Sequence, residues 1–144
     1  MKNFVLVAAM AGSLVSGQAI AACDNASRLA AAAIRTLLGN NTVCVPASPS
    51  PNMTWQELHV GTNSGALIDF KRGPTHAVDP SETVGTWIVN GTGAGNSAVR
   101  HTYLGGGGTY DYTVHGTGVV GTIHSFCGGP TEIVAMVKLG GGAC

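Results

Sequence analysis

Charged side chains are scarce in this chain. Of its 144 residues, 7 are Lys or Arg and 7 are Asp or Glu, so charged residues make up 10% and the formal net charge is zero. Nucleic acids and anionic membrane surfaces are bound by clusters of Lys and Arg, so we expect neither as a partner. The same scarcity, together with 22 glycines, favours strands and tight turns over solvated helices.

Recognisable catalytic and metal-binding motifs are also missing. The sequence has no G-x-S-x-G, no H-E-x-x-H and no C-x-x-C. The run Gly91–Gly95 opens no predicted helix, so it indicates a turn rather than a phosphate-binding loop. The five histidines are scattered, and solvated or hydrogen-bonded imidazole is the default for each. We therefore expect no catalytic residue, no metal and no cofactor, and an enzyme of unrecognised type remains an alternative.

A long uncharged apolar run occurs near the amino terminus, where Phe4–Val15 follows Lys2 and precedes Ala19-Ile20-Ala21. This is the pattern of a secretory signal peptide, and the run is short for a membrane span. We predict a signal peptide over residues 1–21 and one domain over 22–144, located in the periplasm or secreted. In the alternative, Ile20-Ala21-Ala22-Cys23 resembles a lipobox, and the protein is a lipoprotein anchored at Cys23.

Cysteine is rare, but its count is even. Cys23, Cys44, Cys127 and Cys144 match no zinc spacing. In an exported protein they predict two disulfides, for which three pairings are possible. We favour the local pairs Cys23–Cys44 and Cys127–Cys144, each of which closes a loop of about 20 residues.

The hydrophobic pattern predicts one helix followed by strands. Ala26–Leu38 is rich in good helix formers, with Asp24 or Asn25 as the N-cap and Gly39 in a left-handed C-terminal position. After Gly39 the period changes to two, and eight runs have strand character. They are Asn41–Val45, Thr54–Val60, Ala66–Arg72, Val84–Asn90, Ala98–Leu104, Thr109–His115, Val119–Phe126 and Glu132–Leu139.

The connections between these runs are short and rich in glycine, as antiparallel hairpins require. None is long enough for a crossover helix, so a parallel sheet is excluded. We predict an all-β fold, a small antiparallel up-and-down barrel of eight strands that is preceded by one short N-terminal helix. A two-sheet sandwich is the alternative, because it has the same spacing of strands and turns.

Alternation along each strand assigns side chains to faces. It predicts that four sets point inward and leaves open which set of the second strand does so, Trp55, Glu57 and His59 or Gln56, Leu58 and Val60. The inward sets are Ala66, Ile68 and Phe70; Trp87 and Val89; Tyr110, Tyr112 and Val114; and Ile133, Ala135, Val137 and Leu139. By the same phase, His101 shares a face with Val99 and Tyr103.

The eight strands, the length of the chain and the Gly-x-Trp at Gly85-Thr86-Trp87 resemble the calycin group of lipocalins and avidins. The resemblance covers about Asn41 to Leu139, with the Gly-x-Trp on the fourth predicted strand. It implies an up-and-down barrel that holds a ligand inside. In size and composition the chain also resembles small secreted bacterial proteins.

Aromatic rings with polar tips recur on the predicted inward faces. Such rings suit a small, partly aromatic or apolar ligand inside the barrel. The candidate ligand-binding residues are Trp55, His59, Trp87, His101, Tyr103, Tyr110 and Tyr112, with Glu57 beside them if the second strand has that register. In a second hypothesis, the long loop Gly73–Thr83 binds a protein partner, as in an inhibitor.

Overall fold

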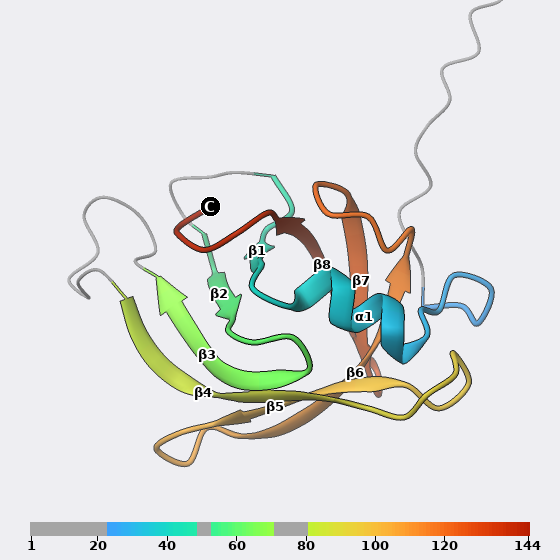
Figure 1. Cartoon of the computed structure of the whole chain (residues 1–144), viewed down its shortest axis with the longest axis horizontal. Helices are drawn as coiled ribbons and strands as arrows, with labels where there is room; N and C mark the ends of the chain where they lie inside the picture. Colours follow the sequence, from blue (N-terminus) through green and yellow to red (C-terminus); the bar gives the residue numbers. More distant parts are fainter. Residues whose placement is uncertain (1–22, 49–52, 71–80) are drawn as a thin grey trace, which may run out of the picture.

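The computed structural model describes residues 23–48, 53–70 and 81–144, and these form one closed antiparallel barrel (Figure 1). Each strand pairs with the next along the chain, and the last pairs with the first. The elements are α1 (Ala31–Leu38), β1 (Thr42–Val45), β2 (Trp55–His59), β3 (Ser64–Phe70), β4 (Ser81–Asn90), β5 (Ala98–Tyr103), β6 (Gly108–Gly116), β7 (Ile123–Gly128) and β8 (Thr131–Lys138). The predicted eight-stranded up-and-down barrel is confirmed.

Pairing of β1 with β8 closes the barrel. Thr42 lies opposite Lys138, and Cys44 lies opposite Met136. In the alternative two-sheet sandwich these strands would be edges with unpaired backbone groups, whereas closure leaves no such edge.

Helix α1 lies across one end of the ring of strands (Figure 1). Its residues Ile34, Leu37 and Leu38 are fully buried and belong to one core cluster with Trp87 and Val99 of the barrel. The helix is also close to the strand connections at that end, since the N–H of Ala31 donates to the carbonyl oxygen of Thr92 at 3.2 Å. A barrel of this size is filled by side chains, and here the helix completes the filling from one end.

The helix is shorter than the sequence predicts, because the residues before it are used differently. The N–H of Leu29 donates to the carbonyl oxygen of Val114 on β6, and Arg28 forms a β-bridge with His115. This segment takes the place beside β6 that β5 leaves free. Asp24 accepts hydrogen bonds from Ser27 instead of capping α1, whose N-cap residue makes no side-chain cap bond.

The C-terminal prediction for the helix is wrong in its mechanism. Gly39 has φ −56°, and the left-handed residue is Asn40, with φ 58°. Glycine is needed at 39 for a different reason: a Cβ there would lie 2.8 Å from the carbonyl oxygen of Arg35 and 3.0 Å from that of Gly61. Close approach of the β2–β3 connection therefore explains the residue.

The inward face predicted for β3 is wrong. In β3, Leu67 is fully buried opposite His59, and Asp69 lies opposite Glu57, so Leu67 and Asp69 face inward. Ala66, Ile68 and Phe70 therefore point outward. A register irregularity between Leu67 and Ile68 accompanies this arrangement. The outer face of β3 is thus the more apolar one. Face prediction from alternation assumes that the more apolar face points to the core, and β3 does not follow that assumption.

The inward faces predicted for the other strands are correct, except just beyond the end of β8. Trp87, Val89, Val114, Ala135 and Val137 are all buried in the core. Leu139, in contrast, follows the end of β8 and is 78% exposed.

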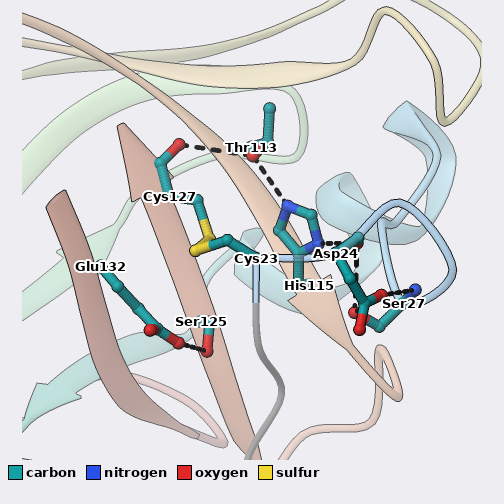
Figure 2. The surroundings of a disulfide bond; sticks show 8 residues. All are labelled: Cys23, Asp24, Ser27, Thr113, His115, Ser125, Cys127 and Glu132. Carbon is teal, nitrogen blue, oxygen red and sulfur yellow. Dashed lines mark hydrogen bonds between the residues drawn. A yellow bond between two sulfur atoms is a disulfide. The ribbon is translucent and has the colours of Figure 1, made fainter. Parts of the chain in front are cut away.

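All four cysteines form disulfides, but the favoured pairing is wrong. Cys23 is bonded to Cys127 and Cys44 to Cys144, with sequence separations of 104 and 100. Each bridge holds a terminal segment against the outside of a strand. In Figure 2 the bridge from Cys23 reaches β7, and His115 lies between the hydroxyl of Thr113 and the backbone carbonyl of Asp24.

Two intact disulfides fit an extracellular or periplasmic location. The bond from Cys23 uses the sulfur atom that would carry a lipid, so it disfavours the lipoprotein alternative. Within residues 23–48, 53–70 and 81–144, no helix is long and apolar enough to span a bilayer. The predicted signal peptide, 1–21, lies outside the described residues.

Non-reducing peptide mapping should recover Cys23–Cys127 and Cys44–Cys144. Because each bridge closes a loop of about 100 residues, replacing Cys44 and Cys144 together by Ala should lower the free energy of unfolding by about 5 kcal/mol in the chain-entropy account. Urea unfolding of the oxidised variant and wild type measures this difference. Recovery of peptides joined through Cys23–Cys44 would contradict the structure.

Candidate functional site

The side chains inside the barrel change in character from one end to the other. Near α1 they are apolar, and toward the opposite end they become aromatic and polar. Register pairs place Glu57 and His59 of β2 opposite Asp69 and Leu67 of β3, which decides the register that the sequence left open. Inward residues toward the open end include Trp55, Glu57, His101, Tyr103, Tyr110 and Tyr112.

Trp87 lies away from this group, in the packed half. It is 1% exposed, and its indole N–H donates to the carbonyl oxygen of Val60 at 2.8 Å. Its ring meets that of His59 edge-on, with centroids 5.1 Å apart. Trp87 and His59 therefore act as core residues rather than as walls of an open space.

The space inside the barrel beneath the mouth is small. A void of about 20 Å³ is bordered by Val43, His101, Tyr112 and Phe126, among others. That volume holds one water molecule. Trp87 borders neither this void nor the larger pocket described next, so these two spaces give no support for a ligand beside Trp87.

A larger pocket, of about 570 Å³, opens at the end opposite α1. We refer to it as the mouth pocket. Its aromatic wall consists of Trp55, Tyr103, Tyr110 and Tyr112, and the remaining lining comprises Glu57, Gly107, Thr109, Asp111, Gly128, Thr131 and Ile133. The ring of Tyr110 stacks on that of Tyr112 at an interplanar angle of 18°. Pockets of this size accept drug-sized molecules.

Two glycines make room for these rings. A Cβ on Gly128 would lie 3.0 Å from the ring of Tyr112, and one on Gly107 would lie 2.7 Å from the Cβ of Tyr103. The tyrosines can lie where they do because the turns beside them carry no side chains.

A chain of hydrogen bonds leads from the mouth pocket into the core. The hydroxyl of Tyr103 lies 3.0 and 3.1 Å from the two carboxylate oxygens of Glu57, and 3.5 Å from Nδ1 of His101. Nε2 of His101 is 3.0 Å from Nε2 of His59, whose Nδ1 faces the backbone carbonyl of Glu57 at 3.2 Å.

The backbone carbonyl at the inner end of this series of hydrogen bonds determines where the protons lie. A carbonyl oxygen only accepts, so Nδ1 of His59 carries the hydrogen. Neutral His59 then accepts at Nε2, and His101 must donate from its own Nε2. This leaves Nδ1 of His101 as an acceptor that faces the hydroxyl of Tyr103. That hydroxyl has one hydrogen and two acceptors, the carboxylate and the imidazole.

Burial explains the protonation states. Desolvation lowers the pKa of His101 to about 4 and that of His59 well below its usual value, where the neighbouring His101 also contributes. Desolvation raises the pKa of Glu57 to about 7, with Asp69 adding to the shift and the hydrogen bond from Tyr103 opposing it. Desolvation, followed by the charge of Glu57, raises the pKa of Tyr103. Among these four hydrogen-bonded side chains, Glu57 is therefore the one that changes its charge near neutral pH.

The remaining described histidines have structural partners. His124 accepts from the N–H of Gly118 at Nε2 and faces the carbonyl of Thr122 with Nδ1. His115 holds the amino-terminal segment through Asp24. Within the described part of the chain, no three His, Cys, Asp or Glu side chains gather as a metal site would require. His76 lies outside the described residues.

Among the acidic residues that the structure describes, Asp69 on the neighbouring strand lies near Glu57. Asp111, at the rim of the mouth pocket, pairs with Arg100 at 2.8 Å. Glu82 is exposed on β4, and Asp79 lies outside the described residues. In the predicted loop Gly73–Thr83, residues 73–80 are likewise outside, and its last three residues belong to β4.

Comparisons of the chain with protein-family models, with curated protein sequences and with solved structures gave no match. We therefore interpret the site from its own geometry. The candidate residues from the sequence include the four rings of the aromatic wall and Glu57. They do not include the other lining residues, Gly107, Thr109, Asp111, Gly128, Thr131 and Ile133. Alternation had placed Ile133 inward, and the Cys127-Gly128-Gly129 turn was the only sign that β7 ends beside an aromatic ring.

Replacing Glu57 by Gln should change how stability depends on pH. A raised pKa in the folded state means that the unfolded chain loses this proton first, so wild type loses stability as the pH rises from about 4.5 to about 7. The variant lacks this loss. Relative to wild type, it should therefore gain about 2 to 3 kcal/mol between pH 5 and pH 8.

Urea unfolding of both proteins at both pH values gives this difference. His59 and His101 also make stability depend on pH, in the opposite direction, but they are present in both proteins and their contributions cancel. Glu82→Gln, on the exposed start of β4, is the control and should show no such change. A Glu57→Gln variant that tracks wild type across the range would contradict the assigned state of Glu57.

Proposed function

We propose that this domain binds a small, partly aromatic molecule in the mouth pocket. The observation that carries the proposal is the gathering of Trp55, Tyr103, Tyr110 and Tyr112 around the carboxyl group of Glu57 at the open end of the barrel. Rings that present an apolar body and a polar tip are well suited to hold a ligand of mixed character. The expected binding position is therefore the mouth, above the packed core.

The frame around the pocket supports this proposal. The ring centroid of Tyr112 lies 6.5 Å from that of Phe126, which it meets edge-on, and 5.6 Å from that of His101. The ring centroids of Tyr103 and Tyr110 are 6.0 Å apart. Rings held in this way lose little rotational freedom when a ligand arrives. A closed barrel with two disulfides also keeps the strands that bear them in place.

Acid–base catalysis is a second candidate, favoured by the chain Glu57–Tyr103–His101–His59. A carboxyl group with a pKa near 7, in a pocket and beside a tyrosine hydroxyl, has the properties of a proton-transferring group. We rank it below binding because the two histidines are buried away from the pocket and reach it only through Tyr103. Turnover of a bound molecule, measured beside binding, would reverse the order.

The hypothesis of a protein-binding loop has no support of its own, because residues 73–80 lie outside the described chain. It would regain weight if the mouth pocket bound no small molecule.

Binding at the mouth should change the fluorescence of Trp55 and leave that of Trp87 unaffected, because only Trp55 borders the pocket. Titration of the protein with a library of small aromatic molecules should give hits whose signal is lost in Trp55→Phe. Tyr112→Ala should weaken each hit at least tenfold, which corresponds to about 1.4 kcal/mol. Thermal shift provides a second readout, since a ligand at one hundred times its Kd adds about 2.7 kcal/mol of stability.

Thr86→Ala, at an exposed position on the outer face of β4, is the control and should bind as wild type does. Hits that retain full affinity in Tyr112→Ala would place the ligand elsewhere. A library with no hits would count against the proposal.

A further inference from the structure

Glu57 is a buried carboxyl group at the edge of an open pocket. It is 7% exposed, and the hydroxyl of Tyr103 donates to it. That single hydroxyl hydrogen is shared between both carboxylate oxygens, and the imidazole of His101 competes for it. A carboxylate accepts several hydrogen bonds, so Glu57 retains unused acceptor capacity.

Positive charge is absent from its described surroundings. The groups around Glu57 are Asp69 on the adjacent strand β3 and, across the barrel interior, His101 and Tyr103 of β5 and Tyr112 of β6. Val43 of β1 and Ile133 of β8 are apolar. None of these is a cation, since burial keeps His101 neutral.

The described basic residues are engaged elsewhere. Arg100 pairs with Asp111, and Arg28 donates to the carbonyl oxygen of Ser97 at 2.9 Å. Arg35 and Lys138 donate to Asn63 and to the carbonyl of Ala143. Lys71 and Arg72 lie outside the described residues.

The aromatic wall has the complementary chemistry. The faces of tryptophan and tyrosine rings attract cations, and cages of such rings bind ammonium groups. Trp55, Tyr103, Tyr110 and Tyr112 border the same pocket as Glu57. A buried carboxylate without a counter-ion is costly, and none of the described residues that border this pocket is a cation.

We infer that the mouth pocket selects ligands that carry an ammonium group on an aromatic or apolar skeleton, with the cation paired to Glu57 and the skeleton against the rings. This rests on the proposed function and specifies the chemical class of its ligand. The ligand would supply the counter-ion that the described residues do not.

Pairing with a cation also has a consequence for protons. A cation next to a carboxyl group favours its ionised form, so binding below pH 7 should release a proton from Glu57. Ionised Glu57 can only accept hydrogen bonds, so the hydroxyl hydrogen of Tyr103 then points to the carboxylate and away from Nδ1 of His101. Ligand binding and the hydrogen-bond chain are coupled through that hydroxyl.

Three probes with a similar skeleton and different charges test the inference: phenethylamine, 2-phenylethanol and phenylacetate. Calorimetry and Trp55 fluorescence at pH 7.5 should show phenethylamine binding at least tenfold more tightly than 2-phenylethanol, and phenylacetate more weakly still. The affinity for phenethylamine should rise at least tenfold from pH 5 to pH 8, as Glu57 ionises. Calorimetry at pH 6 in buffers of different ionisation enthalpy should detect the release of close to one proton.

Variants separate charge from shape. Glu57→Gln should abolish the preference for phenethylamine while 2-phenylethanol still binds, and Glu57→Asp should retain part of it. Glu82→Gln should leave all three affinities unchanged. If Glu57→Gln does not fold, the pH dependence and the proton release in wild type decide the matter alone.

The outcomes distinguish this inference from the function on which it rests. If the neutral or anionic probe binds as well as the amine, the inference is overturned and binding at the mouth stands. If none of the three binds at millimolar concentration, the proposed function falls and the inference falls with it.

Discussion

A closed barrel of eight strands has two ends, and in this protein helix α1 covers one of them. Ile34, Leu37 and Leu38 belong to the same core cluster as Trp87, so the interior is packed at the end that the helix covers. That packing constrains the rest of the site. Polar side chains that face inward can reach solvent only at the opposite end, where β2, β5 and β6 present Glu57, Tyr103 and Tyr112. The position of the mouth pocket is therefore a consequence of where the helix lies.

The two buried histidines lie between the packed end of the interior and the mouth pocket. His59 is fully buried and His101 is 5% exposed, yet each ring nitrogen has a partner. Buried polar groups are tolerated when they are fully hydrogen-bonded, and the chain from the backbone of Glu57 to its own side chain satisfies this condition. The pair is thus explained as a structural element whose outer end contacts the pocket.

Much of the architecture could be predicted from sequence, because strand and turn signals are local. All eight strands were found, and most inward faces followed from alternation. The failures have tertiary causes. Residues 27–29 lie in a stretch with helix-forming sequence but pair with β6. Ala66, Ile68 and Phe70 point outward because the register with β2 places Leu67 and Asp69 inside. No local pattern contains either fact.

The sequence predicted which residue types gather inside the barrel, but not how far into the barrel the pocket extends. Tyr103, Tyr110 and Tyr112 were expected on one face, and they lie there. Whether Trp55, Glu57 and His59 joined them depended on one residue of register, which alternation could not decide. That Trp87 lies in packed core depends on where α1 sits, and the sequence of the helix does not say which end of a barrel it will cover.

The disulfide connectivity has a consequence for how the chain reaches its native state. Ribosomes synthesise Cys23 and Cys44 long before Cys127 and Cys144, and the first two are separated by only twenty intervening residues. Bond formation in order of synthesis would therefore join the wrong pair, and the native bonds would then require thiol–disulfide exchange. The native bonds therefore form either after the β1–β8 seam has closed or by exchange from a first, non-native pair.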